Sequence, residues 1–116
     1  MAIPRRHHVA LSTPDLDRLK AVYRDVIGFA PVFKTPWSAG QTMIGAMMET
    51  GGTAAHAAIL STGDSFLEII ELAAPTPEPR PRERRAIDHG IGHICLAVDD
   101  AVAEYARPST AGVRFH

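Results

Sequence analysis

The sequence predicts an α+β protein that contains two copies of one module, the second of which is incomplete. Strand and helix patterns alternate along the first 74 residues, and the opening pattern returns after a proline-rich segment. In the second copy His93 takes the place of His8, at an offset of 85 residues, and HICLAVDD follows HVALSTPD position by position. A chain of 116 residues suits one small domain, which we place over residues 1–116.

The first module, about residues 5–74, is predicted to begin with a strand and a helix. In HHVALST (7–13), large aliphatic residues alternate with His8 and small residues, which indicates a strand with two different faces. Thr13 followed by Pro14 is typical of a helix start, with threonine as the N-cap. Apolar residues then recur at helical spacing until a glycine, Gly28 in the first copy and Gly112 in the second.

Three more strands complete the first module, and we expect them at residues 29–34, 55–62 and 65–72. Pro31 indicates an edge position or a bulge in the first of them. Residues 35–52 predict a long loop with one helical turn from about Met43 to Met48. Gly63 and Asp64 favour a turn between the last two strands.

A stiff linker, residues 75–86, is predicted between the modules because proline occupies every second position from 75 to 81. The arginines near its end are expected to be solvated. The second module, residues 87–116, is predicted to hold a strand at 92–100, a helix at 101–111 and the start of another strand in GVRFH.

Composition excludes several classes of function. The net charge of −1 and the pI of about 6.6 provide no general attraction to nucleic acid or to anionic membranes. No apolar run is long enough for a signal peptide or a membrane span. Cys95 is the only cysteine, so an intrachain disulfide is excluded and a reducing compartment fits. We expect a cytoplasmic protein.

The two equivalent histidines are candidate metal ligands. His8 shares its strand face with Ala10 and Ser12, and the small neighbours leave room for a ligand. A divalent ion favours mixed imidazole and carboxylate ligands with open positions for water or substrate. Glu68 is the candidate carboxylate, since it lies in the apolar run FLEIIEL, where an unpaired charge would be costly to bury. Glu71 is the rival carboxylate and is expected on the opposite face.

Three segments resemble one known family. HHVALSTPDLDRLKAVYRDVIGF, GDSFLEIIELAAP and DHGIGHICLAVDD are similar to the opening strand and helix, the last strand and the second opening strand of the vicinal oxygen chelate superfamily, which includes glyoxalases, bleomycin-resistance proteins and extradiol dioxygenases. The resemblance implies paired βαβββ modules around one divalent metal ion. It also implies that His8, Glu68 and His93 are metal ligands, and it does not distinguish zinc, nickel, iron, manganese and magnesium.

The function that this resemblance implies is that of a metal-dependent glyoxalase-like lyase or isomerase acting on a small oxygenated substrate. Glu68 is the candidate catalytic residue, as a displaceable ligand or a base. The family's second glutamate, which is absent from these 116 residues, is the better candidate for the base. We expect the chain to be a truncated or partly observed form, and the alternative is a site with three protein ligands. A metal-free drug-binding protein and an extradiol-type dioxygenase remain the alternatives.

Other residues carry weaker predictions. Trp37 and Met47 are candidate substrate-binding residues, since methionine adapts to irregular apolar ligands, but packing in a loop or a dimer interface is an equal alternative. His7 is expected to face solvent or to form a hydrogen bond, and His56 to be structural. Homodimerisation is expected because a small chain with an incomplete second module gains burial from a partner.

Overall fold

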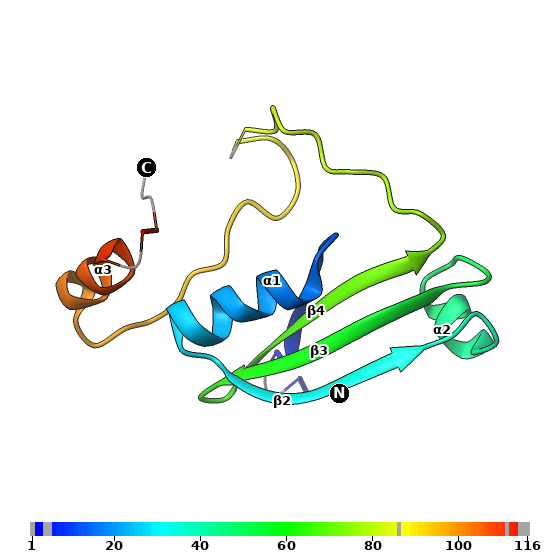
Figure 1. Ribbon diagram of the computed structural model, residues 1–116, viewed down its shortest axis with the longest axis horizontal. Coiled ribbons are helices and arrows are strands. Elements are labelled where there is room, and N and C mark those ends of the chain that lie inside the picture. Colours follow the sequence, from blue (N-terminus) through cyan, green and yellow to red (C-terminus); the bar gives the residue numbers. More distant parts are fainter. Residues whose placement is uncertain (1, 4–5, 86, 111, 114–116) are drawn as a thin grey trace. The chain divides into compact units, whose positions relative to one another are not determined.

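The computed structural model describes residues 2–3, 6–85, 87–110 and 112–113. The chain divides into two compact units, Met1–Pro77 and Glu78–His116. The first contains a four-stranded sheet with helices, and the second contains one helix among its described residues (Figure 1). This mixture of sheet and helix confirms the predicted α+β class.

The elements follow one another in the order that the sequence predicts for the first module. They are β1 (His8–Ser12), α1 (Leu16–Ala21), the π-helical turn η1 (Val22–Ile27), β2 (Ala30–Trp37), α2 (Thr42–Met47), β3 (Ala54–Thr62), β4 (Ser65–Ala74) and, in the second unit, α3 (Ala101–Thr110). The sheet has the strand order β1-β4-β3-β2. β1 pairs with β4 in parallel, and the other two pairs are antiparallel.

The start of α1 corrects the prediction that Thr13 is the N-cap. Asp15 is the cap, because its carboxylate accepts a hydrogen bond of 2.9 Å from the Arg18 N–H. Thr13 remains part of the strand ladder, since its N–H donates to the Ile70 carbonyl at 2.9 Å. The helix therefore begins two residues later than expected. Its predicted end is confirmed: Gly28 adopts the left-handed conformation with a φ of 99° after η1.

The remaining strands confirm the predicted elements and extend them. β2 is an edge strand with a register shift between Pro31 and Phe33, so both readings of the proline were right. It continues to Trp37, three residues beyond the predicted end at 34. The helical turn expected near Met43 is α2, and Gly63, at a φ of 52°, forms the turn between β3 and β4.

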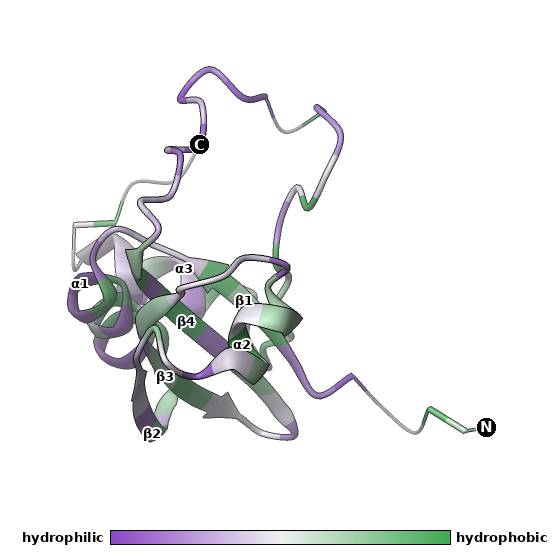
Figure 2. Cartoon of the chain, turned by 90° about the vertical axis from the view of Figure 1, so that its right-hand side faces the viewer, coloured by the Kyte–Doolittle hydropathy of each residue, from purple (hydrophilic) through white to green (hydrophobic). Residues whose placement is uncertain are grey.

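One face of the sheet forms the hydrophobic core under α1 and η1 (Figure 1). The strongly apolar segments lie in β3 and β4, as Figure 2 shows. The buried core residues are Leu16, Phe29, Ala58, Leu60, Leu67 and Ile69. Leu60 and Ile69 are fully buried, and burial of one such side chain stabilises the fold by about 1.5–3 kcal/mol. Alternate residues of the same strands must point to the opposite face.

The second unit corrects one prediction and confirms another. Residues 91–98, in the expected strand 92–100, have no regular structure, and no described segment of this unit pairs with them. Alternation in a sequence predicts two faces, but a strand also needs a neighbour for its backbone N–H and C=O groups. The helix expected at 101–111 is α3. The expected strand GVRFH begins with a turn at Gly112, and its last three residues lie outside the described ones.

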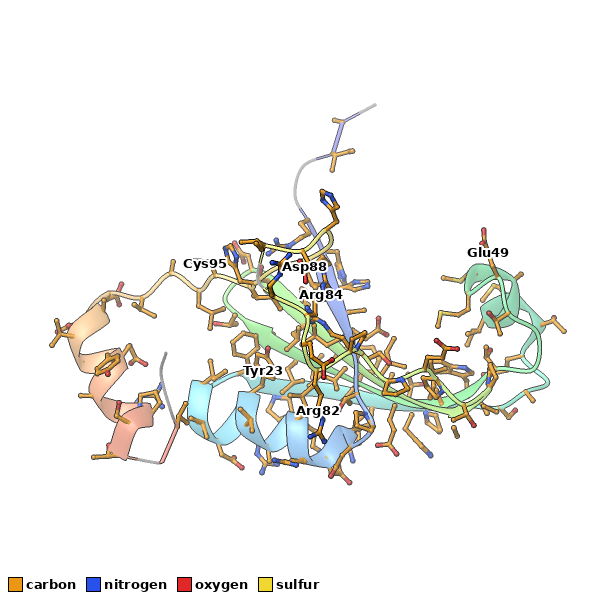
Figure 3. All side chains as sticks on the ribbon, turned by 90° about the horizontal axis from the view of Figure 1, so that it is seen from above. Tyr23, Glu49, Arg82, Arg84, Asp88 and Cys95 are labelled. Atoms are coloured by element: carbon orange, nitrogen blue, oxygen red, sulfur yellow. The ribbon has the colours of Figure 1, made fainter. Side chains whose placement is uncertain are left out.

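An ordered turn precedes this irregular segment. The Arg84 guanidinium donates to the Asp88 carbonyl at 3.4 Å and also to the His89 carbonyl, and Arg84 lies beside Asp88 in Figure 3. The Asp88 carboxylate in turn binds the Arg85 guanidinium at 2.9 Å. Gly90 has a φ of 125°, a backbone conformation that favours glycine. The turn is held by side chains rather than by a hydrophobic core.

Candidate metal centre

The face of the sheet opposite α1 carries His8 and Glu68. Leu67 and Ile69 of β4 belong to the core on the helix side, so Glu68 between them faces the other way. Ala10 of β1 is the pairing partner of Glu68 and lies on this same face. The methyl side chain of Ala10 leaves the space beside the carboxylate open. We call the face that bears these residues the open face.

His8 and Glu68 lie within reach of one ion. His8 Nε2 is 3.6 Å from Glu68 Oε2, and the two side chains are 42% and 24% exposed. Two ligand atoms that are each about 2.1 Å from a metal ion lie about 3–4 Å apart. The observed distance thus suits a shared ion, and it exceeds the 2.7–3.2 Å that is usual for an N–H···O hydrogen bond. The geometry of this pair fits a divalent metal.

Glu71 faces the helix side, as the sequence predicts. Its Oε2 accepts a hydrogen bond of 2.7 Å from the backbone N–H of Leu16, the first residue of α1. Glu71 therefore ties β4 to the start of the helix, and this role was not expected from the sequence. The alternation of side chains along the strand FLEIIEL predicted the face, but a contact with a residue 55 positions away along the chain has no local signal.

His7 supports His8 from the neighbouring position. The two Nδ1 atoms are 2.8 Å apart, and the rings meet edge to face with centroids 5.1 Å apart. The His7 ring also stacks on Phe66, with centroids 4.9 Å apart and an angle of 18° between the planes. The His7 carbonyl accepts a hydrogen bond of 3.2 Å from the Phe66 N–H. His7 is thus held at both its backbone and its ring.

His93 belongs to the second unit and lies in the irregular segment between the Arg84 turn and α3. It is exposed, as is Cys95 two residues later. Within the described residues, no three His, Cys, Asp or Glu side chains form a group that could hold a metal ion. Within the first unit the structure brings His8 and Glu68 together. The role of His93 stays a prediction.

The candidate substrate-binding residues Trp37 and Met47 lie on other elements of the first unit. Trp37 ends β2 and pairs with Ala55, whose partner on β4 is Leu72, four residues beyond Glu68. The indole N–H of Trp37 is buried and has no hydrogen-bond partner among the described residues. Met47, on α2, is 77% exposed. Neither placement tests their predicted role.

The helix side carries a separate group of charges. Asp17 of α1 binds Lys20 at 2.6 Å and Lys34 of β2 at 3.1 Å. The hydrogen bond from Lys20, followed by that from Lys34, lowers the pKa of Asp17 from 3.8 to about 2. A pocket of about 320 Å³ lies beside this group, and His56 and Glu71 are among its lining residues. These charges connect α1 to the sheet on the face opposite Glu68.

The chain matches the Glyoxalase/Bleomycin resistance protein/Dioxygenase superfamily over residues 5–116. It belongs to this superfamily. It is similar in structure to a glyoxalase family protein from Bacillus cereus, with a TM-score of 0.81 and 18% identity over 97% of this chain and 74% of that one. It also resembles the structure of SMU.1112c, with a TM-score of 0.67 and 22% identity over 97% and 78% of the two chains. Both similarities bear on the fold alone.

One curated relative is 35% identical over 112 residues, a protein of an Actinomyces species named 2-epi-5-epi-valiolone epimerase. The match covers 93% of this chain and 60% of the relative, so the chain spans less than two thirds of that protein's length. None of the helices in the described part of the chain is both long and apolar enough to cross a membrane.

Proposed function

We propose that this chain contributes to a metal-dependent isomerase or lyase of the glyoxalase type that acts on a small oxygenated substrate. The observation that carries the proposal is the pairing of His8 Nε2 with Glu68 Oε2 at 3.6 Å on the open face. An imidazole and a carboxylate at this distance suit a divalent ion with open positions. The epimerase named among the relatives favours an epimerisation beside a carbonyl group as the reaction.

In this proposal His8, Glu68 and His93 are the metal ligands. When bound, the ion would supply Lewis-acid polarisation of a substrate carbonyl or hydroxyl pair. Glu68 is proposed to act as a displaceable ligand or as a base, because a carboxylate beside the substrate can accept the proton that an epimerisation removes. Trp37 and Met47 are proposed to contact the apolar part of the substrate, and a homodimer is the proposed assembly.

The first test compares Glu68→Gln with Glu71→Gln in the purified chain. Both variants lose one carboxylate of β4, but only Glu68 lies on the open face beside His8. We expect Glu68→Gln to lose bound metal and Glu71→Gln to keep it, as measured by elemental mass spectrometry. The proposal is wrong if Glu68→Gln binds as much metal as the unaltered chain.

The second test uses stability. A ligand that binds only the folded state at 100 times its dissociation constant stabilises it by about 2.7 kcal/mol. Added Zn²⁺ should therefore raise the midpoint of thermal unfolding for the unaltered chain and for Glu71→Gln. His8→Ala and Glu68→Gln should show a much smaller increase. An equal increase in all four proteins would show that the ion binds elsewhere and would overturn the His8–Glu68 site, whereas no increase in any of them would favour the alternative of a metal-free binding protein.

A further inference from the structure

The neighbouring rings of His7 and His8 restrict which nitrogen of His8 carries its proton. A neutral imidazole has one N–H donor and one acceptor nitrogen. The two Nδ1 atoms lie 2.8 Å apart, so one of them must donate and the other must accept. If His8 Nδ1 carries the proton, then His8 Nε2 has a free lone pair, and this is the nitrogen that lies 3.6 Å from Glu68.

We propose that His7 is a positioning residue that accepts the Nδ1 proton of His8 and thereby keeps His8 Nε2 free to bind the metal. The inference rests on the proposed function for the identity of the ligand, but the hydrogen bond itself does not depend on metal. Histidines that bind metals usually donate their other ring N–H to a fixed acceptor, which sets both the tautomer and the ring orientation. His7 supplies an acceptor of this kind.

His7 can act in this way because the ring itself is fixed. Its stacking on Phe66 and the hydrogen bond from the Phe66 N–H to its carbonyl hold it at the start of β4. Phe66 is also the pairing partner of His8 in the β1–β4 ladder. The positions of the His7 and His8 rings are therefore both set by β4. Glu68 lies two residues farther along that strand. One strand therefore orders the acceptor His7, the ligand His8 and the carboxylate Glu68.

The second module lacks this arrangement. The residue before His93 is Gly92, at the offset of 85 that relates the two copies, and glycine has no side chain to accept a proton. The proposed ligands therefore differ in how they are held: His8 has an adjacent imidazole, and His93 does not. The role of His7 is consequently specific to the first module.

The variants His7→Phe and His7→Asn separate stacking from hydrogen bonding. Phenylalanine keeps an aromatic ring against Phe66 but has no acceptor, whereas asparagine places an amide oxygen near the position of Nδ1. His56→Phe is the control, because His56 lies on the helix side of the sheet. Far-ultraviolet circular dichroism should show the same folded spectrum for all of these proteins.

The decisive measurement is the tautomer of His8 in the metal-free chain, read from long-range proton–nitrogen NMR spectra at a pH where imidazoles are neutral. We expect the Nδ1–H form in the unaltered chain, in His7→Asn and in His56→Phe, and a shift toward the Nε2–H form in His7→Phe. Zn²⁺ affinity, measured by competition with a chelating dye, should fall on the order of 10-fold in His7→Phe and recover in His7→Asn.

The outcomes distinguish the two proposals. An unchanged His8 tautomer in His7→Phe overturns the role of His7 and leaves the metal centre standing. Unchanged Zn²⁺ affinity in His8→Ala overturns the metal centre, whereas the tautomer shift would still show that His7 governs the His8 proton. A loss of Zn²⁺ affinity in His7→Phe that His7→Asn does not restore also overturns the proposal, because it assigns the effect to something other than the acceptor.

Discussion

The helices of the two modules begin and end alike but differ in what they bury. Asp15 caps α1 through the Arg18 N–H at 2.9 Å, and Asp100, 85 residues later, caps α3 through the Val102 and Ala103 N–H groups at 3.0 Å each. The glycines that follow the two helices both adopt left-handed conformations, with φ values of 99° and 84°. By contrast, α1 buries Leu16 to 4% exposure, and α3 has no buried residue.

The difference between the two helices shows which features depend on nearby residues and which depend on a partner surface. A cap needs one side chain within three residues, so the same aspartate starts a helix in both modules. A strand and a buried helix face need a partner surface. β1 obtains its partner in β4, whereas residues 91–98 have no ladder among the described residues of their unit. The two modules therefore share their helix caps, but only the first has a paired opening strand and a helix with a buried face.

The largest expected contrast is in the core. Leu60→Ala removes a fully buried side chain under α1 and should lower the free energy of unfolding by about 2–5 kcal/mol. Val102→Ala in α3 alters a residue that is 80% exposed and should change it by no more than about 0.5 kcal/mol. Urea unfolding followed by circular dichroism measures both. Similar losses in the two variants would show that α3 is packed as α1 is.

The helix ends provide the second contrast. Gly28→Ala places a side chain at a φ of 99°, where a Cβ meets no atom within 4 Å, so its cost is backbone strain alone. We expect a loss of about 1–2 kcal/mol in the free energy of unfolding. Gly112→Ala carries the same strain at 84° but should leave the urea midpoint unchanged, since α3 can fray locally. An equal decrease of the urea midpoint in both variants would show that the end of α3 does not fray independently of the rest of the fold.

Substitution of the two N-cap aspartates should give the same contrast between α1 and α3, with smaller changes in stability. Asp15→Ala should cost about 1 kcal/mol of global stability, since α1 is part of the core. Asp100→Ala should leave the urea midpoint unchanged and instead increase the hydrogen exchange of backbone amides in the first turn of α3. Asp15→Asn and Asp100→Asn, which keep a capping oxygen, are the controls and should retain most of the effect of aspartate.

The elements that could be predicted are those with local or periodic signals. Glycine at 28, the turn at 63–64 and the strands expected at 55–62 and 65–72 each depend on neighbours in sequence, and the structure confirms them. The N-cap was misplaced because Thr13 and Asp15 both carry capping oxygens. The choice between them is made by a ladder hydrogen bond to Ile70, 57 positions away, which no local pattern reveals.

The candidate site was predictable to the same degree. The face and the pairing of His8 and Glu68 followed from alternation and from the family resemblance, and the structure brings the two side chains to 3.6 Å. The adjacent histidine pair was visible in the sequence, but its geometry depends on Phe66, which a strand from elsewhere in the chain supplies. The assignment of His93 as third ligand remains a prediction from the repeat.

The smallest expected contrast concerns acid. Asp17 in α1 binds Lys20 and Lys34, and its pKa is lowered to about 2, whereas the equivalent position in α3 is Val102, which cannot ionise. Because the folded pKa lies below the ordinary value of 3.8, the ionised carboxylate stabilises the first module above about pH 4. This contribution is lost as the pH falls from about 4 to about 2.

Asp17→Asn should therefore lower the urea midpoint slightly at pH 5 and much less at pH 2, where about half of the Asp17 carboxylates in the unaltered chain are protonated. Asp17 is strongly exposed and solvent screens its ion pairs, so the difference at pH 5 should be small and should shrink further in 1 M salt. The comparison uses the difference between the two proteins at each pH, since other carboxylates titrate equally in both. A difference that is as large at pH 2 as at pH 5, or that resists salt, would show that Asp17 acts through packing, and the acid sensitivity of α1 would then have another origin.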